Sequence, residues 1–439
     1  MSSTLLIVAL VVLAFVGGRY VRQFAARFGM VSGAESLVLG VLIGPSVFGL
    51  LDASSLAPAH LLVALLLGLV GFTTGTRARR LAPQPDAVVI GIAAALGTGL
   101  TLALLVLGWM YHFEEAPADP VIAWQLPILG QYTLELVADA RQLQIAAVLA
   151  ACGVATNSAV IEATVAQSGA RGRVSNLLAG VAVTAEILAI AGLGLALAVR
   201  RRVQGGAGVE LGVTEWVLAG VAVGIFCGLL FAWFMRDEED PNRIFVASTG
   251  SVIFAAGVGE ALGLSPTFIN LLAGLTVALV SPQARAICGE LERLRHPIQV
   301  LVMVFAGVLL AVPQGPAWLL VGLYPLARWL ALRVSVKGAA TMLLETPVQA
   351  PRLGDGLLVQ GELPVVIAAA YAMRAPEAGA LVLAAVLAAS LSTDLWSGRA
   401  LAAVLMDAGE VGQGAPAEGP VAPDIAGLPD TPPAVEADS

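Results

Sequence analysis

The strongest constraint on this chain is a series of long apolar segments, joined by short loops, that runs from residue 4 to residue 405. A helix needs about 20 mostly apolar residues to cross the hydrocarbon core of a bilayer. Charged residues make up only 12% of the 439 residues, whereas a soluble domain carries about a quarter. The sequence therefore predicts an all-α polytopic membrane protein. It excludes a disordered chain, a disulfide scaffold or a nucleic-acid binder as the main identity.

Hydropathy predicts thirteen transmembrane helices, which we place by their approximate residue ranges. These are 4–23, 31–51, 57–76, 86–111, 144–167, 173–199, 211–235, 243–262, 265–283, 297–313, 317–340, 355–374 and 379–405. Residues 407–439 differ in kind, because they hold seven acidic residues, six prolines and no basic residue. That composition predicts a disordered, acidic, Pro-rich tail after a membrane domain of residues 1–406.

Arginine residues in the short loops predict the orientation, because cytoplasmic loops of membrane proteins are enriched in Arg and Lys. Loops after odd-numbered spans hold most of them, and the cluster Arg200–Arg202 runs against this pattern. We therefore expect the N-terminus outside and the C-terminus in the cytoplasm. The segment from His112 to Arg141 is then external, with an amphipathic helix expected around residues 132–143.

Four polar residues lie near the middle of four different predicted spans. They are Asn157 in the fifth, Glu186 in the sixth, Arg328 in the eleventh and Glu362 in the twelfth. An ionisable side chain at the bilayer centre costs at least about 2.5–3.5 kcal/mol, so it marks a functional site by default. Because these four groups share one depth, we expect them to form one site.

Two of these helices also carry residues that interrupt a helix. Gly361 and Pro364 flank Glu362, and the run from Thr156 to Ser158 can compete for backbone hydrogen bonds. Broken helices at the bilayer midplane, in corresponding places of two halves, indicate the ion site of a transporter. The sequence thus predicts two broken, crossing helices within inverted repeats formed by spans 4–6 and 11–13.

Glu186 suits ion exchange because one carboxylate can hold either a proton or a cation. Desolvation favours the protonated acid and a bound cation favours the carboxylate, so the two ligands compete. We predict a monovalent cation at Glu186 and Asn157, with Ser158 and Thr156 as further proton- or ion-binding groups. Arg328 cannot realistically deprotonate, and we expect it to pair with Glu362 or with Glu186 as a fixed charge.

A purely structural ion cluster of Glu186, Glu362 and Arg328 is the alternative interpretation. Glu162, in the inner half of the fifth span, is a candidate for the lining of a cytoplasmic funnel. The three cysteines lie in or beside apolar segments and lack metal-like spacing. We expect no cofactor, no enzymatic activity and no nucleic-acid partner.

Several short motifs occur in a specific order along the chain. They are residues 39–50 (LGVLIGPSVFGL), 155–160 (ATNSAV), 169–173 (GARGR), 263–266 (GLSP), 272–275 (LAGL) and 360–362 (QGE). In this order and spacing they resemble the monovalent cation:proton antiporter superfamily, in particular its bacterial potassium-efflux and sodium/proton exchanger branches.

The resemblance implies roles for individual residues. Glu186 occupies the place of the ion-binding aspartate, and Asn157 and Ser158 match the polar residues of the unwound helix. Arg328 matches the buried basic residue, and Glu362 lies in the second broken helix. The resemblance also implies a homodimer in the bacterial inner membrane. A core (about 86–199 and 317–405) would move elevator-fashion against a scaffold (about 4–76 and 211–313).

The chain departs from the family pattern at the ion-binding position, because a glutamate, Glu186, stands in place of the aspartate and Ala185 precedes it. One carboxylate rather than two suggests electroneutral exchange of one cation, Na⁺ or K⁺, for one proton by alternating access. Two other functions stay open. The chain could form a passive cation channel or uniporter, or a transport-inactive membrane scaffold or sensor that signals through its tail.

Overall fold

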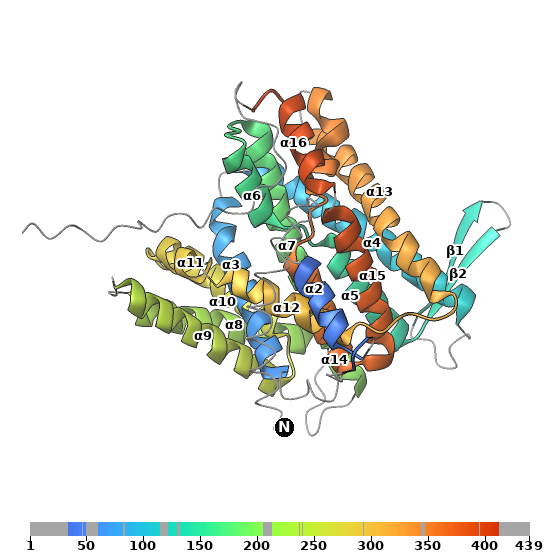
Figure 1. Cartoon of the computed structure of the whole chain (residues 1–439), viewed down its shortest axis with the longest axis horizontal. Helices are drawn as coiled ribbons and strands as arrows, with labels where there is room; N and C mark the ends of the chain where they lie inside the picture. Colours follow the sequence, from blue (N-terminus) through green and yellow to red (C-terminus); the bar gives the residue numbers. More distant parts are fainter. Residues whose placement is uncertain are drawn as a thin grey trace, which may run out of the picture.

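The computed structural model describes residues 34–45, 47–49, 60–81, 84–114, 122–129, 132–204, 213–236, 238, 240–292, 294–343, 347–394 and 396–411. Figure 1 shows the order of the elements. The helices are α2 (Ala34–Ile43), α3 (His60–Arg77), η2 (Ala78–Leu81), α4 (Pro85–Phe113), α5 (Ala140–Val154), α6 (Ser158–Gln167), α7 (Arg173–Gln204), α8 (Val213–Phe234), α9 (Pro241–Leu262), α10 (Pro266–Val280), α11 (Ala284–Glu292), α12 (Arg295–Leu309), α13 (Ala317–Leu343), η3 (Pro347–Leu357), α14 (Glu362–Arg374), α15 (Pro376–Asp394) and α16 (Ser397–Asp407). Two strands, β1 (Ile122–Leu129) and β2 (Tyr132–Ala138), pair in antiparallel fashion.

The predicted spans agree with these helices over the described part of the chain. Every predicted span from 31–51 onward contains at least one helix, and the span 4–23 lies outside the described residues. Among the described residues, six helices are long and apolar enough to cross a membrane, or seven if α15 and α16 form one bent span. Shorter apolar helices are found within α3, α10 and α12.

The predicted amphipathic helix around residues 132–143 is wrong. Its first part is strand β2, and α5 begins only at Ala140. In the sequence, apolar residues alternate with polar ones from Tyr132 to Glu135, which is the two-residue period of a strand. Asp139 then starts α5 through a capping box, because its side chain and that of Gln142 each accept from the other's backbone N–H.

The predicted boundary of the tail also needs correction. Asp407 is the last residue of α16, residues 408–411 follow it outside any helix, and residues 412–439 lie outside the described residues. Asp407 accepts a hydrogen bond of 2.6 Å from Arg352. The Glu410 carboxylate accepts hydrogen bonds from the backbone N–H groups of Val174 (2.6 Å) and Ser175 (2.8 Å), at the start of α7.

One group of helices packs around α10, which contacts α3, α8 and α9. The backbones of α3 and α10 approach very closely. A Cβ added at Gly71 or at Gly274 would lie 2.2 Å from a backbone carbonyl oxygen of the facing helix. Small residues permit such contacts, which are typical of helix packing in membranes.

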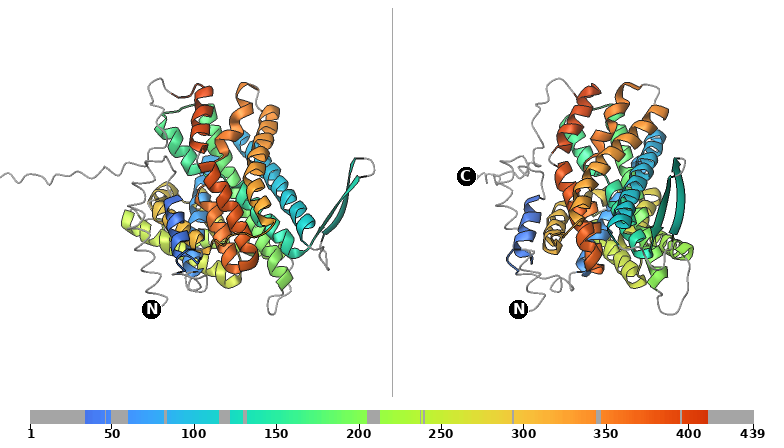
Figure 2. Two further views of the ribbon diagram at one scale, coloured as in Figure 1. Left: turned by 45° about the vertical axis from the view of Figure 1, so that its right-hand side comes forward. Right: turned by 90° about the vertical axis from the view of Figure 1, so that its right-hand side faces the viewer.

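A second group of helices contains two runs of elements in the same order. A long helix, an interrupted element and another helix occur as α4, α5–α6 and α7, and again as α13, η3–α14 and α15–α16. Within this group α4 contacts α5, α7 and α13, and α13 contacts η3 and α15. Figures 1 and 2 show α4 and α13 side by side. These are the two repeats that the sequence predicts.

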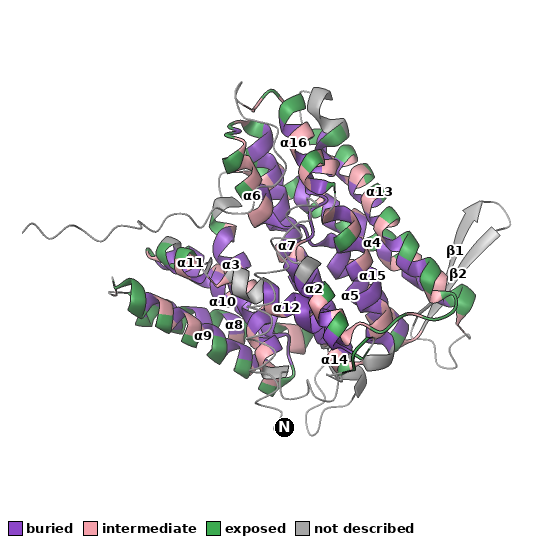
Figure 3. Cartoon of the chain, viewed as in Figure 1, coloured by how far each residue is buried: buried purple, intermediate pink, exposed green. Residues whose placement is uncertain are grey.

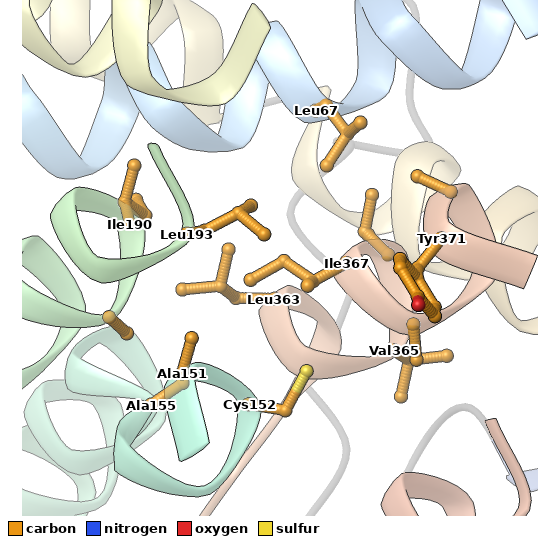
Figure 4. Packing of buried hydrophobic residues seen from close by; sticks show 14 of the residues in the cluster. Leu67, Ala151, Cys152, Ala155, Ile190, Leu193, Leu363, Val365, Ile367 and Tyr371 are labelled. Atoms are coloured by element: carbon orange, nitrogen blue, oxygen red, sulfur yellow. The ribbon is translucent and has the colours of Figure 1, made fainter. Parts of the chain in front are cut away.

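Burial is greatest where the interrupted elements lie. The most apolar window of the α5–α6 segment is mostly buried, whereas only about a third of the corresponding windows in α8 and α9 is buried (Figure 3). Every residue of α14 from Glu362 to Ala372 is buried. Figure 4 shows Leu363 and Ile367 of α14 facing Leu193 of α7 and Leu67 of α3. The start of α14 is thus fixed at the centre of the molecule.

Candidate ion-binding site

The first interruption separates α5 from α6 at residues 155–157. Short polar side chains compete with the helical backbone for hydrogen bonds, and three of them follow one another here. Asn157 caps the new helix, because its Oδ1 accepts a hydrogen bond of 3.1 Å from the backbone N–H of Val160. The first turn of a helix offers N–H donors that lack helical partners and that favour a bound anion.

The Glu186 carboxylate binds this first turn of α6 from the neighbouring helix α7. Its Oε1 accepts a hydrogen bond of 2.7 Å from the backbone N–H of Ser158, and its Oε2 accepts one of 3.0 Å from the Ser158 hydroxyl. Only 5% of the Glu186 surface is exposed. The positive end of α6 therefore faces the carboxylate that the sequence selects as the ion ligand.

The second interruption lies before α14, and its form differs from the prediction. The expected span 355–374 is not one continuous helix, because η3 ends at Leu357, residues 358–361 have no regular secondary structure, and α14 begins at Glu362. Gly361 has φ of +67°, a conformation that favours glycine. Pro364 falls in the first turn of α14, where a missing N–H costs no helical hydrogen bond.

The two interruptions contact each other through Asn157. Its backbone N–H donates to the carbonyl of Val359 at 2.8 Å, and its Nδ2 donates to Glu362 Oε2 at 3.1 Å. The structure thus brings together Asn157, Ser158, Glu186 and Glu362, as their shared depth predicts.

Arg328 lies beside this site, but it does not make the ion pair that the sequence predicts. Its fully buried guanidinium donates to three backbone carbonyls. The acceptors are Gly153 (2.8 Å), Ala155 (3.1 Å) and Leu358 (2.9 Å). Both interruptions leave carbonyls without helical donors, and the planar fork of arginine fits several acceptors at once. Arg328 therefore joins the two interrupted segments.

Other side chains also stabilise the interrupted backbone. The Thr156 hydroxyl donates to the carbonyl of Leu357 at 3.2 Å. Thr156 does not line the cleft that contains Glu186. Gln360 Nε2 donates to the carbonyl of Cys152 at 3.0 Å. These hydrogen bonds fix the positions of the two interrupted segments relative to each other.

Arg77 is a site residue that the sequence analysis missed. It is the last residue of α3, where the orientation argument treats an arginine that follows a span as a loop charge. In the structure only 5% of its surface is exposed, and its Nη1 donates to Ser158 Oγ at 3.4 Å. The sequence gives no signal that separates an arginine in a solvated loop from an arginine buried at the end of a helix.

A cleft with about 490 Å³ of empty space, part of it open to the outside, reaches these groups. It is lined by Leu69, Val70, Thr73, Thr74, Arg77, Asn157, Glu186, Leu291, Gln360, Glu362 and Leu363. Glu162 is half-buried on α6 and does not line it. A second cavity, with about 320 Å³ of empty space that is also partly open to the outside, is lined by Leu67, Leu193, Ile367 and Arg374, among others.

The structure thus places a buried carboxylate at an interrupted helix, inside a bundle of helices that are long and apolar enough to cross a membrane. No family model and no curated protein matches the sequence. Two solved structures of the sodium proton antiporter MjNhaP1 from Methanocaldococcus jannaschii are similar, one of them at pH 8. The first is 14% identical with a TM-score of 0.65 over 92% of this chain and 99% of that one. The second is 15% identical with a TM-score of 0.65 over 92% and 97%.

These similarities show the fold. The predicted helical membrane fold with two interrupted segments is confirmed, and this fold is shared with the sodium proton antiporter MjNhaP1. Strands β1 and β2 are the departure from an all-α chain within the described residues.

Proposed function

We propose that this protein is a secondary antiporter that exchanges a monovalent cation, Na⁺ or K⁺, for H⁺ by alternating access. The observation that carries the proposal is the position of Glu186, whose buried carboxylate lies in the cleft against the positive end of α6. One carboxylate can hold a proton or a cation there, and the two compete for it. The solved structures of the same fold are of a sodium proton antiporter.

The two cavities support alternating access. Glu186 lines one cavity and does not line the other. Leu67, Leu193 and Ile367 line the second cavity and pack in the same apolar core as Leu363, next to Glu362 (Figure 4). In this conformation Glu186 is therefore reached from the first of these two cavities. Moving α14 and α7 past α3 would open the other side.

We assign the moving core to α4–α7 and α13–α16 and the scaffold to α2, α3 and α8–α12, in a homodimer of the bacterial inner membrane. The N-terminus is placed outside and the C-terminus in the cytoplasm. The cleft supports this division, since α3 and α11 contribute one wall and α7 with the two interruptions contribute the other. Glu186 is the carboxylate that accepts hydrogen bonds from Ser158 in the first turn of α6, and one such carboxylate supports electroneutral one-for-one exchange.

The test is a cation panel in proteoliposomes with a pH-sensitive dye, run with and without a clamp of the membrane potential. Na⁺ or K⁺ gradients are expected to drive proton flux that does not change with the potential. A conductance without coupled proton movement would instead identify a passive channel. Removal of residues 412–439 is expected to leave flux unchanged, whereas a sensor that signals through its tail would lose its output.

A further inference from the structure

A chain of hydrogen bonds connects a buried arginine to the candidate ion ligand. Arg77 Nη1 donates to Ser158 Oγ at 3.4 Å, and the same oxygen lies 3.0 Å from Glu186 Oε2. A guanidinium has no acceptor, so the one hydroxyl proton of Ser158 is directed to the carboxylate. The guanidinium nitrogen is therefore no farther from the carboxylate oxygen than these two distances added together.

The charge of Arg77 is fixed and it lies inside the cleft. An arginine side chain stays protonated under all ordinary conditions, and a buried charge requires nearby compensation. Arg77, Glu186 and Glu362 are the ionisable residues that line this cleft among the described residues. A cation that binds Glu186 from the cleft therefore binds next to an existing positive charge.

The helix that carries Arg77 belongs to the other side of the cleft. Helix α3 packs mainly on α10 and α9, whereas Glu186 and Ser158 belong to α7 and α6. The positive charge and the carboxylate are thus supplied by the two helix groups that the transport cycle is proposed to move relative to each other.

We propose that Arg77 is an internal cation that competes with the transported cation for Glu186 and so sets the affinity of the site. The inference rests on the proposed function, since it concerns the same carboxylate. Cation binding displaces or repels the guanidinium, and release of the cation is assisted by its return. Arg77 acts here as a specificity- and affinity-determining residue, although its own proton is not exchanged.

Removal of the charge is expected to strengthen cation binding. Two unit charges about 6 Å apart, at an effective dielectric constant of about 20, change an affinity by about a hundredfold. Water in the open part of the cleft screens the pair, so we expect a change of about tenfold. Damage to the fold would weaken binding, and this direction therefore separates competition from a structural role.

The experiment measures the full-length protein in two ways. Binding of Na⁺ and K⁺ is followed by cation-dependent thermal stabilisation of the purified protein, and KM and kcat by flux in proteoliposomes. The variants are R77Q, R77M and R77K, with R79Q as the control, because Arg79 is exposed two residues later. R77Q and R77M are expected to lower the Kd and KM for the cation about tenfold, with kcat equal or reduced. R79Q is expected to keep the wild-type values, and R77K, which keeps the positive charge, is expected to shift the Kd and KM by much less than R77Q and R77M do.

Unchanged or weaker cation binding in R77Q and R77M overturns the inference, and so does a tenfold tightening in R77K. If R77Q does not purify as a folded protein, the comparison of R77M with R77K decides. If the wild type binds the cation and R77M binds it more tightly, but no proton flux occurs, the proposed function fails and the inference stands.

Discussion

Gly361 is the position at which a single methyl group should disable the site. Its φ of +67° and ψ of −154° are costly for any residue with a Cβ, about 1–3 kcal/mol. A Cβ at this position would also lie 1.7 Å from Asn157 Nδ2. Asn157 must then move away from Glu362, which removes a hydrogen bond to a charged group worth about 1.5–3 kcal/mol.

The expected loss of folding free energy for G361A is therefore about 3–6 kcal/mol. The assay is thermal unfolding in detergent together with cation-driven proton flux in proteoliposomes. G338A is the matched control, because Gly338 lies inside helix α13 and a Cβ added there would meet nothing within 4 Å. Alanine there is expected to be neutral or to stabilise by about 0.5–1 kcal/mol. A G361A protein with wild-type melting temperature and flux would refute the account of how the two interruptions fit together.

Two further predictions concern single side chains. R328K can satisfy fewer of the three carbonyls that Arg328 contacts, so we expect a loss of about 1–3 kcal/mol in thermal unfolding; a wild-type melting temperature would contradict the role of the guanidinium. E410Q removes the charge that binds the start of α7 and is expected to cost about 0.5–2 kcal/mol. Deletion of residues 412–439 leaves this cap intact and should not change the melting temperature. A lower melting temperature in the deletion but not in E410Q would show that the cap is unimportant.

Much of the site follows from the sequence because depth in a membrane is readable from position in an apolar span. Asn157, Glu186 and Glu362 have few reasons to lie at mid-bilayer other than a shared site, and the structure brings them together. The glycine and proline next to Glu362 indicate an interruption, since neither continues a helix well. These arguments need no knowledge of the helix arrangement.

The partners of the two arginines could not be predicted in this way. Arg328 contacts carbonyls whose availability depends on where two other segments leave the helical conformation. Arg77 contacts Ser158 because α3 crosses next to the start of α6, which is a property of the packing. The strand β2 was missed for a different reason, because seven residues fit a helical period and an alternating period almost equally well.

The central claim is that Glu186 is the carboxylate that a cation and a proton occupy in turn. The most direct measurement is cation-driven pH change in proteoliposomes containing wild type, E186Q or E215Q. Glu215 is exposed at the start of α8, so E215Q makes the same chemical change outside the cleft. The account predicts that E215Q keeps the flux and E186Q loses it. Persistent cation-driven proton flux in E186Q would contradict the account.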